Sequence, residues 1–378
     1  MARRLRTTSI AAGGDAVARD DDGKVVFVAG ALPGEVVDVE ITTDKKDFRR
    51  AHVLDVVEPA AGRVAPPCPH IARGCGGCAW QGFDVVIQRA LKREIVADAL
   101  GRIGHIDSPH VDDGPDLTNT AFRTTVRLAA GRGFRAARSH DVVDIDECLV
   151  AHPLIQDLMR ELVVDDATEV TLRCGTRTGE RLVVTDGTVV HVPADVRVGP
   201  KAHLHEEVAG RTWCISAHSF FQARPDGADA LVDAVQRAAS DAPPDGPLVD
   251  AYGGVGLFAG TVGVDRETTV VEWNRSSVAD ARHNVPDATV LRLDVARWRP
   301  SAADVVVADP ARAGLGRDAA ARLAGTGASH LVLVSCDPAA LGRDARLLAE
   351  HGFTHDGTTV VDLFPHTPHV ECVTRFIR

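Results

Sequence analysis

The chain has 378 residues, of which 45% are hydrophobic and 25% charged, with 8 cysteines and a formal net charge of -11. This length exceeds one ordinary domain core and predicts two or three domains. No apolar run approaches the roughly 18 residues of a membrane helix, and the basic start is not followed by the apolar stretch of a secretory signal. We therefore expect a soluble, cytoplasmic protein with no membrane and no obligate protein partner. Cysteines stay reduced there, which disfavours disulfides and leaves metal binding or catalysis.

Positive charge is clustered although the chain is acidic on average. The clusters are Arg3, Arg4 and Arg6; Lys45, Lys46, Arg49 and Arg50; and Arg123, Arg127, Arg132, Arg135 and Arg138. Local patches determine where a polyanion docks, whereas the net charge does not. Each cluster is a candidate for phosphate contact, with an ordinary solvated surface as the alternative.

The N-terminal half reads as two β-rich units. Residues 1–60 alternate short apolar runs with Gly and Asp turns, which predicts a small OB-like barrel, a fold that often binds oligonucleotides. A proline-rich linker follows, and from Phe83 to Ile103 apolar residues recur at helical spacing. Residues 61–83 and 106–215 carry strand-like runs and are assigned to a central β-rich domain.

The remaining residues, 84–105 and 216–378, are assigned to an α/β domain. From about Ser216 onward, amphipathic helical stretches alternate with short, continuous apolar strands. Strands of this kind form a parallel sheet that is covered on both faces. Ligands bind such sheets beyond the carboxyl ends of the strands, so the residues that follow each strand are the candidates for chemistry.

Four cysteines form a candidate metal site. They are Cys68, Cys75, Cys78 and the more distant Cys148, and glycines surround the first three. Four thiolates can hold a zinc ion or a [4Fe–4S] cluster, and spacing alone does not separate the two. Incidental spacing is the remaining alternative. Cys174 and Cys214 lie inside strand-like runs and are interpreted as buried hydrophobic residues.

A glycine-rich turn points to a nucleoside cofactor. Asp250 ends a strand and is followed by Gly253, Gly254 and Gly256 before an expected helix. Glu272 ends the next strand, about 20 residues on, where an acid would accept ribose hydroxyls; Asp294 ends the strand after that, near an adenine position. The turn lacks the full G-x-G-x-x-G spacing. A single nucleoside such as S-adenosylmethionine is therefore favoured over NAD, with a purely structural turn as the third interpretation.

Two further strand ends carry DPARAG, beginning at Asp309, and SCDPA, which contains Cys336; FPHTPHVE ends at Glu371. A cysteine at the carboxyl end of a strand is directed into the ligand crevice, which favours a nucleophile over a buried structural thiol. His366, His369 and Cys372 flank Glu371. A second metal site there is less favoured than supporting roles, because no further ligands are apparent.

These motifs resemble the RNA (uracil-5-)-methyltransferase family over nearly the whole chain. FRTTVRL, SFFQ, DAYGGVG, DPARAG, SCDPA and FPHTPHVE occur in the family's order; GALPGE looks like part of a TRAM domain, and the four cysteines look like the family's [4Fe–4S] site. The combination is most similar to the 23S rRNA branch. The resemblance implies a class I methyltransferase fold, S-adenosylmethionine and a [4Fe–4S] cluster as cofactors, and RNA as the partner.

The resemblance also implies residue roles. Cys336 would add to carbon 6 of a flipped-out uracil, Glu371 would remove the carbon 5 proton, and Asp309 would lie near the base and the cofactor. The cofactor positions of the family are matched by Gln222, Tyr252, Glu272 and Asp294, beside the turn residues named above and Asp309.

The chain departs from the family at several points: Gly253 and Gly254 stand in the glycine turn where many relatives have Cys-Gly-x-Gly, and the central region is short. Leu257 stands where the 23S branch often has a polar residue, and Arg224 stands where Asn is usual after SFFQ. The choice between rRNA and tRNA therefore stays open. Two rival interpretations remain, a non-catalytic RNA-binding or redox-sensing iron–sulfur protein and a small-molecule methyltransferase.

Overall fold

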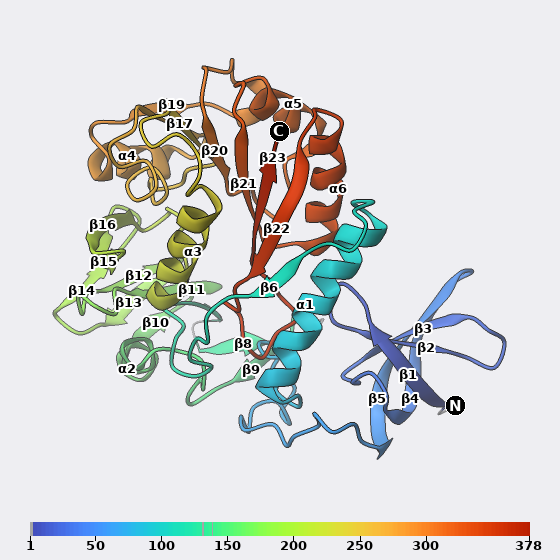
Figure 1. Cartoon of the computed structure of the whole chain (residues 1–378). Coiled ribbons are helices and arrows are strands. Elements are labelled where there is room, and N and C mark those ends of the chain that lie inside the picture. Colours follow the sequence, from blue (N-terminus) through green and yellow to red (C-terminus); the bar gives the residue numbers. More distant parts are fainter. Residues whose placement is uncertain (1–2, 131, 138) are drawn as a thin grey trace.

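The computed structural model describes residues 3–130, 132–137 and 139–378, so Arg138 of the third basic cluster lies outside the described residues. The described chain forms an N-terminal barrel, a central β-rich region and a C-terminal α/β region (Figure 1). No helix in these ranges combines the length and apolar character that crossing a membrane requires.

The N-terminal strands close into a barrel in the order β1-β2-β3-β5-β4, as the sequence predicted. The strands are β1 (Arg3–Ile10), β2 (Ala16–Arg19), β3 (Val25–Ala29), β4 (Val36–Asp44) and β5 (Phe48–Glu58). Alternate side chains fill the interior, since successive residues of a strand point to opposite faces; Val26 and Val28, and Val37 and Val39, are fully buried.

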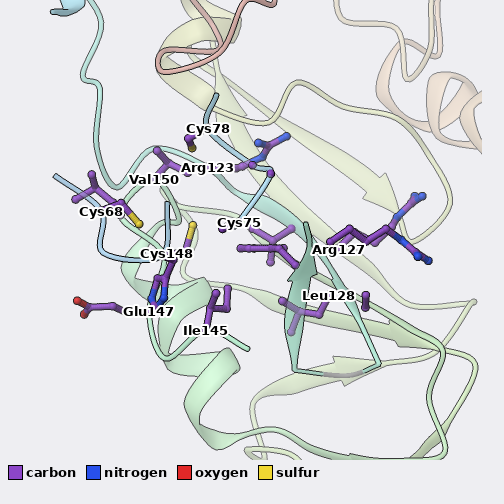
Figure 2. Close-up of a pocket in the computed structure, with 18 of the residues that line it drawn as sticks. Cys68, Cys75, Cys78, Arg123, Arg127, Leu128, Ile145, Glu147, Cys148 and Val150 are labelled. Atoms are coloured by element: carbon purple, nitrogen blue, oxygen red, sulfur yellow. The ribbon is translucent and has the colours of Figure 1, made fainter. Parts of the chain in front are cut away.

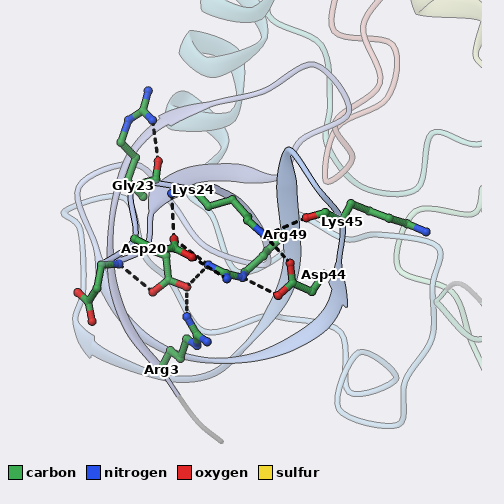
Figure 3. Close-up of polar contacts among 10 residues, drawn as sticks. Arg3, Asp20, Gly23, Lys24, Asp44, Lys45 and Arg49 are labelled. Atoms are coloured by element: carbon green, nitrogen blue, oxygen red, sulfur yellow. Dashed lines mark hydrogen bonds and ion pairs between the residues drawn. The ribbon is translucent and has the colours of Figure 1, made fainter.

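A buried arginine holds one side of the barrel together. Arg49 is only 7% exposed and donates to Asp20 at 2.7 Å, to Asp22 at 2.8 Å and to Asp44 at 3.0 Å (Figure 3). The N–H groups of this guanidinium donate to three carboxylates within the protein, so they are not free to bind a phosphate. Arg49 is therefore a structural residue, and its role as a phosphate contact, one of the expectations above, is wrong.

Other members of the basic clusters also form internal ion pairs. Arg3 contacts Asp20, Arg4 contacts Asp38, Arg6 contacts Glu58 and Arg50 contacts Asp15. Lys45 and Lys46 remain exposed on the β4–β5 connection. Clustering in the sequence thus overstated the positive charge that the barrel presents to solvent.

Helix α1 (Val85–Arg102) connects the barrel to the rest of the molecule (Figure 1). Its predicted span is confirmed, and Asp84 caps its N-terminus by accepting a 2.9 Å hydrogen bond from a backbone N–H two residues on. Leu91 and Ile95 pack into the barrel core, whereas Val96 and Leu100 pack into the core of the α/β region. One helix therefore supplies apolar side chains to two cores.

The central region is built on a six-stranded sheet in the order β14-β12-β11-β7-β8-β9. The strands are β7 (Thr125–Ala129), β8 (Gly133–Arg135), β9 (Val142–Asp144), β11 (Glu169–Cys174), β12 (Arg181–Thr185) and β14 (Val196–Val198). Helix α2 (Pro153–Glu161) packs on β11, and a separate pair is formed by β10 (Val163–Asp165) and β13 (Thr188–His191).

The C-terminal region contains an eight-stranded sheet in the order β19-β18-β17-β20-β21-β23-β22-β6. The strands are β17 (Leu248–Ala251), β18 (Thr268–Glu272), β19 (Thr289–Arg292), β20 (Val305–Ala308), β21 (His330–Ser335), β22 (Thr354–Val360), β23 (Cys372–Ile377) and β6 (Val111–Asp113). The first five in the sheet are parallel, and β23 is antiparallel to both of its neighbours. The predicted parallel sheet is confirmed.

Helices cover both faces of this sheet, which explains the uninterrupted apolar strands. On β20, Val305 and Val307 pack in the core with α3 (Pro225–Ala238) and α4 (Arg275–Asn284), and Val306 and Ala308 pack in the other core. That second core also contains residues of α1, α5 (Gly316–Ala324) and α6 (Pro338–Ala349), and the short helix η1 (Val295–Arg297) contributes Val295.

The structure divides residues 106–215 differently from the expectation of one central block. Strand β6 lies at the edge of the eight-stranded sheet, where it pairs with β22. The hairpin of β15 (His203–Val208) and β16 (Arg211–Ser216) packs against α3 and α4, because its inward side chains, Trp213 among them, belong to the α/β core. Strand-like patterns alone do not reveal which sheet a strand joins.

Prediction for the buried ion pair. The Lys92 side chain is fully buried on α1, where it donates to Asp362 at 2.6 Å and to the Phe364 carbonyl at 2.8 Å. Lys92→Met leaves the Asp362 carboxylate without its cation, so we expect the free energy of unfolding to fall by about 3–5 kcal/mol in urea denaturation. Arg102→Met, on the same helix but with a side chain that is 79% exposed, is the matched control and should change it by less than about 0.5 kcal/mol. Equal effects of the two substitutions would contradict the assignment.

Candidate active site and cysteine pocket

Three catalytic candidates meet at one edge of the eight-stranded sheet. Cys336 directly follows β21, Asp309 directly follows β20, and Glu371 directly precedes β23. Because β23 runs antiparallel, its first residue lies beside the last residue of β21, and the register pairs Ser335 with Cys372. Continued by one residue, the same register places Cys336 beside Glu371. The sequence predicted that Asp309 and Cys336 follow strands, and the strand order places them and Glu371 at the same edge of the sheet.

Burial and mutual charge perturb all three groups. Glu371 is 4% exposed, and burial together with the neighbouring Asp309 carboxylate raises its pKa well above the usual range. Burial raises the pKa of Asp309 to about 7. The Cys336 thiol is half-buried, and burial, followed by the charges of Glu371 and Asp309, raises its pKa to about 12, against the lowering effect of Arg312. These titratable groups lie close enough to shift one another's pKa values, as catalytic groups often do.

The segment that presents Glu371 is fixed from outside the sheet. The Val361 N–H donates to the Glu371 carbonyl at 2.8 Å, which closes residues 361–371 into a loop. The Gln88 side chain of α1 accepts from the His366 N–H at 2.6 Å, and the adjacent Asp362 is held by Lys92. Helix α1 thereby orients the loop on which the proposed base is carried.

The glycine turn after β17 has the backbone that a nucleoside site requires. Gly254 and Gly256 have positive φ angles, and so does Tyr252 at 59°, a strained value for a residue with a side chain. A Cβ on Gly253 would lie 2.7 Å from a Val270 methyl group, so only glycine lets the turn approach β18. Residues 253–263 form consecutive turns and not the regular helix that we expected.

Two acids anchor this turn. Asp250 is fully buried and accepts from the Ala259 N–H at 2.8 Å, and burial raises its pKa to about 7. Glu272, at the end of β18, accepts from the Gly254 N–H at 3.0 Å and from the Asn274 N–H at 2.7 Å. The Glu272 carboxylate therefore already contacts the turn that a ribose would adjoin.

The other cofactor candidates lie around the same edge. Asp294 is exposed and accepts from the Ala296 N–H at 2.9 Å, and Gln222 is 7% exposed in the loop before α3. Sequence reasoning missed Trp273 and Phe220, which are 67% and 69% exposed. Large exposed aromatic side chains beside strand ends offer stacking surfaces for a base. The signal was available, since Trp273 directly follows Glu272 and Phe220 lies within SFFQ.

The four candidate cysteines surround a second site, a cavity of about 490 Å³ in the central region (Figure 2). Cys68, Cys75, Cys78 and Cys148 all line it, together with apolar side chains and the arginines Arg123, Arg127 and Arg135. Burial, followed by the charges of Cys148 and Cys75, raises the pKa of Cys78 to about 12, with Gln81 opposing the shift. Cys68 influences Cys148 in the same way, so the thiols act on one another across the cavity.

The spacing of these sulfurs bears on the choice of metal. Thiolates on one zinc ion lie roughly 3.8 Å apart, given Zn–S bonds of about 2.3 Å. No three of the four sulfurs, all of them in described residues, lie within 4.8 Å of one another. An iron–sulfur cluster distributes its thiolates over several irons and needs wider spacing. Four thiolates around one cavity are a donor set for an iron–sulfur cluster or for a zinc ion.

The structure also explains residues whose roles the sequence left open. Arg224 is 1% exposed, pairs with Asp226 at 2.6 Å and stacks 4.4 Å from the Phe122 ring centroid, so it is a packing residue and not a surface contact. Leu257 is buried in the α/β core. His366 donates from Nε2 to the Asn119 carbonyl at 3.0 Å, and no metal-ligand group containing it is found among the described residues.

Comparisons with known proteins identify the family of the chain. Residues 7–54 match the TRAM domain. The chain is 32% identical to an "Uncharacterized RNA methyltransferase" of Streptomyces avermitilis, covering 96% of this chain and 95% of the relative. It is 31% identical to the "23S rRNA (uracil(1939)-C(5))-methyltransferase RlmD" of Halomonas elongata, covering 98% and 88%. The chain belongs to the RNA (uracil-5-)-methyltransferase family.

A solved structure confirms the fold of this RNA methyltransferase. The tRNA (uracil-54, C5)-methyltransferase of Pyrococcus abyssi, in complex with S-adenosyl-L-homocysteine, superimposes with a TM-score of 0.78 at 22% identity, covering 99% of this chain and all of that one. The barrel, the central region and the α/β sheet are thus shared over the whole length. The predicted class I methyltransferase fold with an N-terminal TRAM barrel is confirmed.

Prediction for thiol reactivity. Asp309→Asn removes a charge that raises the pKa of Cys336, so at pH 9 a larger fraction of the thiol is ionised and alkylation by iodoacetamide should be several-fold faster than in the unsubstituted protein. Peptide mass spectrometry of the Cys336 peptide measures the rate. Asp294→Asn, an exposed acid at the same edge that does not act on this thiol, should leave the rate unchanged. An unchanged rate in Asp309→Asn would refute the electrostatic account.

Proposed function

We propose that this enzyme methylates carbon 5 of one uridine in RNA, with S-adenosylmethionine as the methyl donor and with Cys336 and Glu371 as catalytic residues. The observation that carries the proposal is the β21–β23 register, which sets a thiol opposite a buried carboxyl group at the ligand-binding edge of a methyltransferase sheet. Family membership makes an RNA substrate the natural one. The 31% identity to a 23S rRNA enzyme favours rRNA, and tRNA is the alternative.

The donor fits the residues at the glycine turn. The turn admits close approach, Glu272 lies where ribose hydroxyls would bind, and Tyr252, Gln222 and Asp294 border the same edge. When bound, S-adenosylmethionine supplies an electrophilic methyl group on a positively charged sulfonium, and that charge lowers the raised pKa values of the neighbouring acids and thiol.

The residues of this chain then divide the reaction between them. The Cys336 thiolate adds to carbon 6 of the uracil, and the electron pair of the former double bond makes carbon 5 nucleophilic. Carbon 5 would take up the methyl group as the methyl–sulfonium bond breaks, and the donor would leave as a neutral thioether. Glu371 removes the proton from carbon 5, the double bond re-forms, and the sulfur leaves as thiolate. Asp309, whose charge raises the pKa of Glu371, increases the basicity that this last step requires. The uracil must leave its stack to reach the crevice.

Two assignments complete the proposal. Cys68, Cys75, Cys78 and Cys148 hold a [4Fe–4S] cluster that fixes the loop of residues 68–78 on the central sheet. The TRAM barrel and the arginines of the central region hold the RNA around the target, in the cytoplasm. Lys45 and Lys46 are among the exposed basic residues that the barrel contributes.

Prediction for the nucleophile and the base. In a strain that lacks the gene, mass mapping of total RNA should lose 5-methyluridine at one site, and the unsubstituted gene but not Cys336→Ala should restore it. The purified Glu371→Gln protein should accumulate a covalent RNA adduct, because it can add and methylate but cannot remove the proton.

The control for this experiment is RNA that contains 5-fluorouridine. Fluorine replaces the proton that the base removes, so the unsubstituted protein should form a stable adduct and Cys336→Ala should form none. A pure RNA-binding protein would form no adduct with either RNA. Full activity of Cys336→Ala would exclude the covalent mechanism.

Prediction for the cluster. Cys148→Ser should abolish the visible absorbance and the iron content of the anaerobically purified protein, because one of four thiolates is lost. Cys174→Ser, at a buried cysteine outside the cavity, is the matched control and should retain both. Zinc in place of iron in the unsubstituted protein would overturn the assignment.

A further inference from the structure

A group of three metal-ligand side chains lies outside both sites described so far. His203, His205 and Cys214 come from the β15–β16 hairpin, and their ligand atoms all lie within 4.8 Å of one another. It is the only group of three or more His, Cys, Asp or Glu ligands this close in the part of the chain that the structure describes. The methylation chemistry uses none of these residues.

The hairpin geometry gathers these side chains on one face. His203 and His205 are two residues apart on β15, and His205 pairs directly with Cys214 across the hairpin. The intervening Leu204, and Ile215 opposite it, point into the core and are almost fully buried. Strand alternation therefore turns all three ligands to the outer face, where cross-strand neighbours are closest.

The surroundings of His205 support a ligand role. Its Nδ1 lies 3.2 Å from a carboxylate oxygen of Glu180, and that carboxylate also accepts from the His205 N–H at 2.7 Å. Arg197 fixes the carboxylate in turn, with two contacts of 2.8 and 2.9 Å to Glu180. A histidine that donates Nδ1–H to a carboxylate presents Nε2 as the free ligand atom, which is the usual arrangement around zinc.

The cysteine argues in the same direction. The sequence pattern predicted Cys214 to be a buried hydrophobic residue, but its side chain is only half-buried and lies on the outer face beside two histidines. Cys174, predicted in the same way, is indeed buried. A free thiol near the surface is open to oxidation, and coordination by a metal gives it a partner.

We propose that His203, His205 and Cys214 bind one transition-metal ion of the zinc class, with solvent in the fourth position. Two imidazoles and one thiolate are ligands that suit zinc and not magnesium or calcium. Bond lengths of about 2.1 Å to nitrogen and 2.3 Å to sulfur place ligand atoms roughly 3.3–3.6 Å apart, so the side chains need close by little more than 1 Å. Rotation of the exposed His203 supplies most of that movement.

The ion would stiffen the hairpin where it meets the cofactor half. At the end of β16, the Ser216 N–H donates to Asp280 of α4 at 2.9 Å, and Ser219, beyond the strand, also contacts Asp280. Phe220 and Gln222 follow directly. The site thus lies at the start of the segment that leads to the cofactor edge, and its metal would act on stability and not as a reactant.

The test uses the whole protein with its cysteine pocket loaded, stripped of loosely bound metal by a chelator that leaves the visible absorbance intact. Zinc titration should show one equivalent bound per chain and a rise in Tm, and cobalt should give the near-ultraviolet absorption of a cobalt–thiolate bond. Magnesium should do neither.

Substitutions assign the ion to this hairpin. His203→Ala and Cys214→Ser should each lose the equivalent, the Tm rise and the cobalt–thiolate band, and Glu180→Gln should weaken zinc binding by about 10- to 100-fold. His191→Ala, at an exposed histidine on β13, is the matched control and should retain all three. The metal-free Tm of His203→Ala should equal that of the unsubstituted protein, which separates ligand loss from misfolding.

Two results would overturn the site. One is an unsubstituted protein that binds no zinc beyond its loaded cysteine pocket. The other is undiminished zinc binding and Tm rise in Cys214→Ser and His203→Ala, which would place the ion elsewhere. Methyl transfer enters none of these readouts, so failure here leaves the proposed function untouched, and failure of the proposed function leaves this site untouched.

Discussion

The antiparallel insertion of β23 between β21 and β22 is the constraint on which the active site depends. In a wholly parallel sheet the carboxyl edge collects only residues that follow strands. Because β23 runs in the opposite direction, the residue that precedes it also lies at this edge. Glu371, near the C-terminus, therefore lies beside Cys336. The backbone hydrogen bonds of the β21–β23 ladder set this pairing, and a slip of one residue would turn Glu371 to the other face of the sheet.

Electrostatics and packing reinforce that arrangement. Glu371, Asp309 and Asp250 lie where burial opposes their charged forms, and the pKa values of all three are raised. Such groups destabilise a fold unless their surroundings are held rigidly, because a flexible loop would carry them into water. The loop is held by α1, through the buried Lys92 and the amide of Gln88. The buried acids are thereby held in place, where a bound cation such as a sulfonium would stabilise their charged forms.

The sequence predicted individual helices and strands better than it predicted which elements contact one another. Strand ends, the glycine turn and the helix at residues 85–102 follow local patterns, and so did the choice of Cys336. The roles of Asp309 and Glu371 were implied by the family resemblance. What local patterns could not supply was long-range pairing. The acids that pair with Arg49 lie 5 to 29 residues away along the chain, so local patterns could not reveal its burial. Likewise, β6 joins the eight-stranded sheet and the β15–β16 hairpin packs into the α/β core, and neither partner is specified by the residues of these strands. The prediction that Cys214 is buried was wrong for the same reason. Alternation along a strand shows that side chains point to two faces, but it does not show which face is buried.

Helix α1 has one more consequence. Its 18 residues span about 27 Å, and it is embedded in the barrel core at one part and in the sheet core at another. Because Leu91 and Ile95 lie in the barrel core and Val96 and Leu100 lie in the α/β core, the helix joins the two bodies directly. The helix therefore sets the separation between the barrel and the catalytic residues. An RNA that contacts both must present its target nucleotide at that separation from its contact with the barrel.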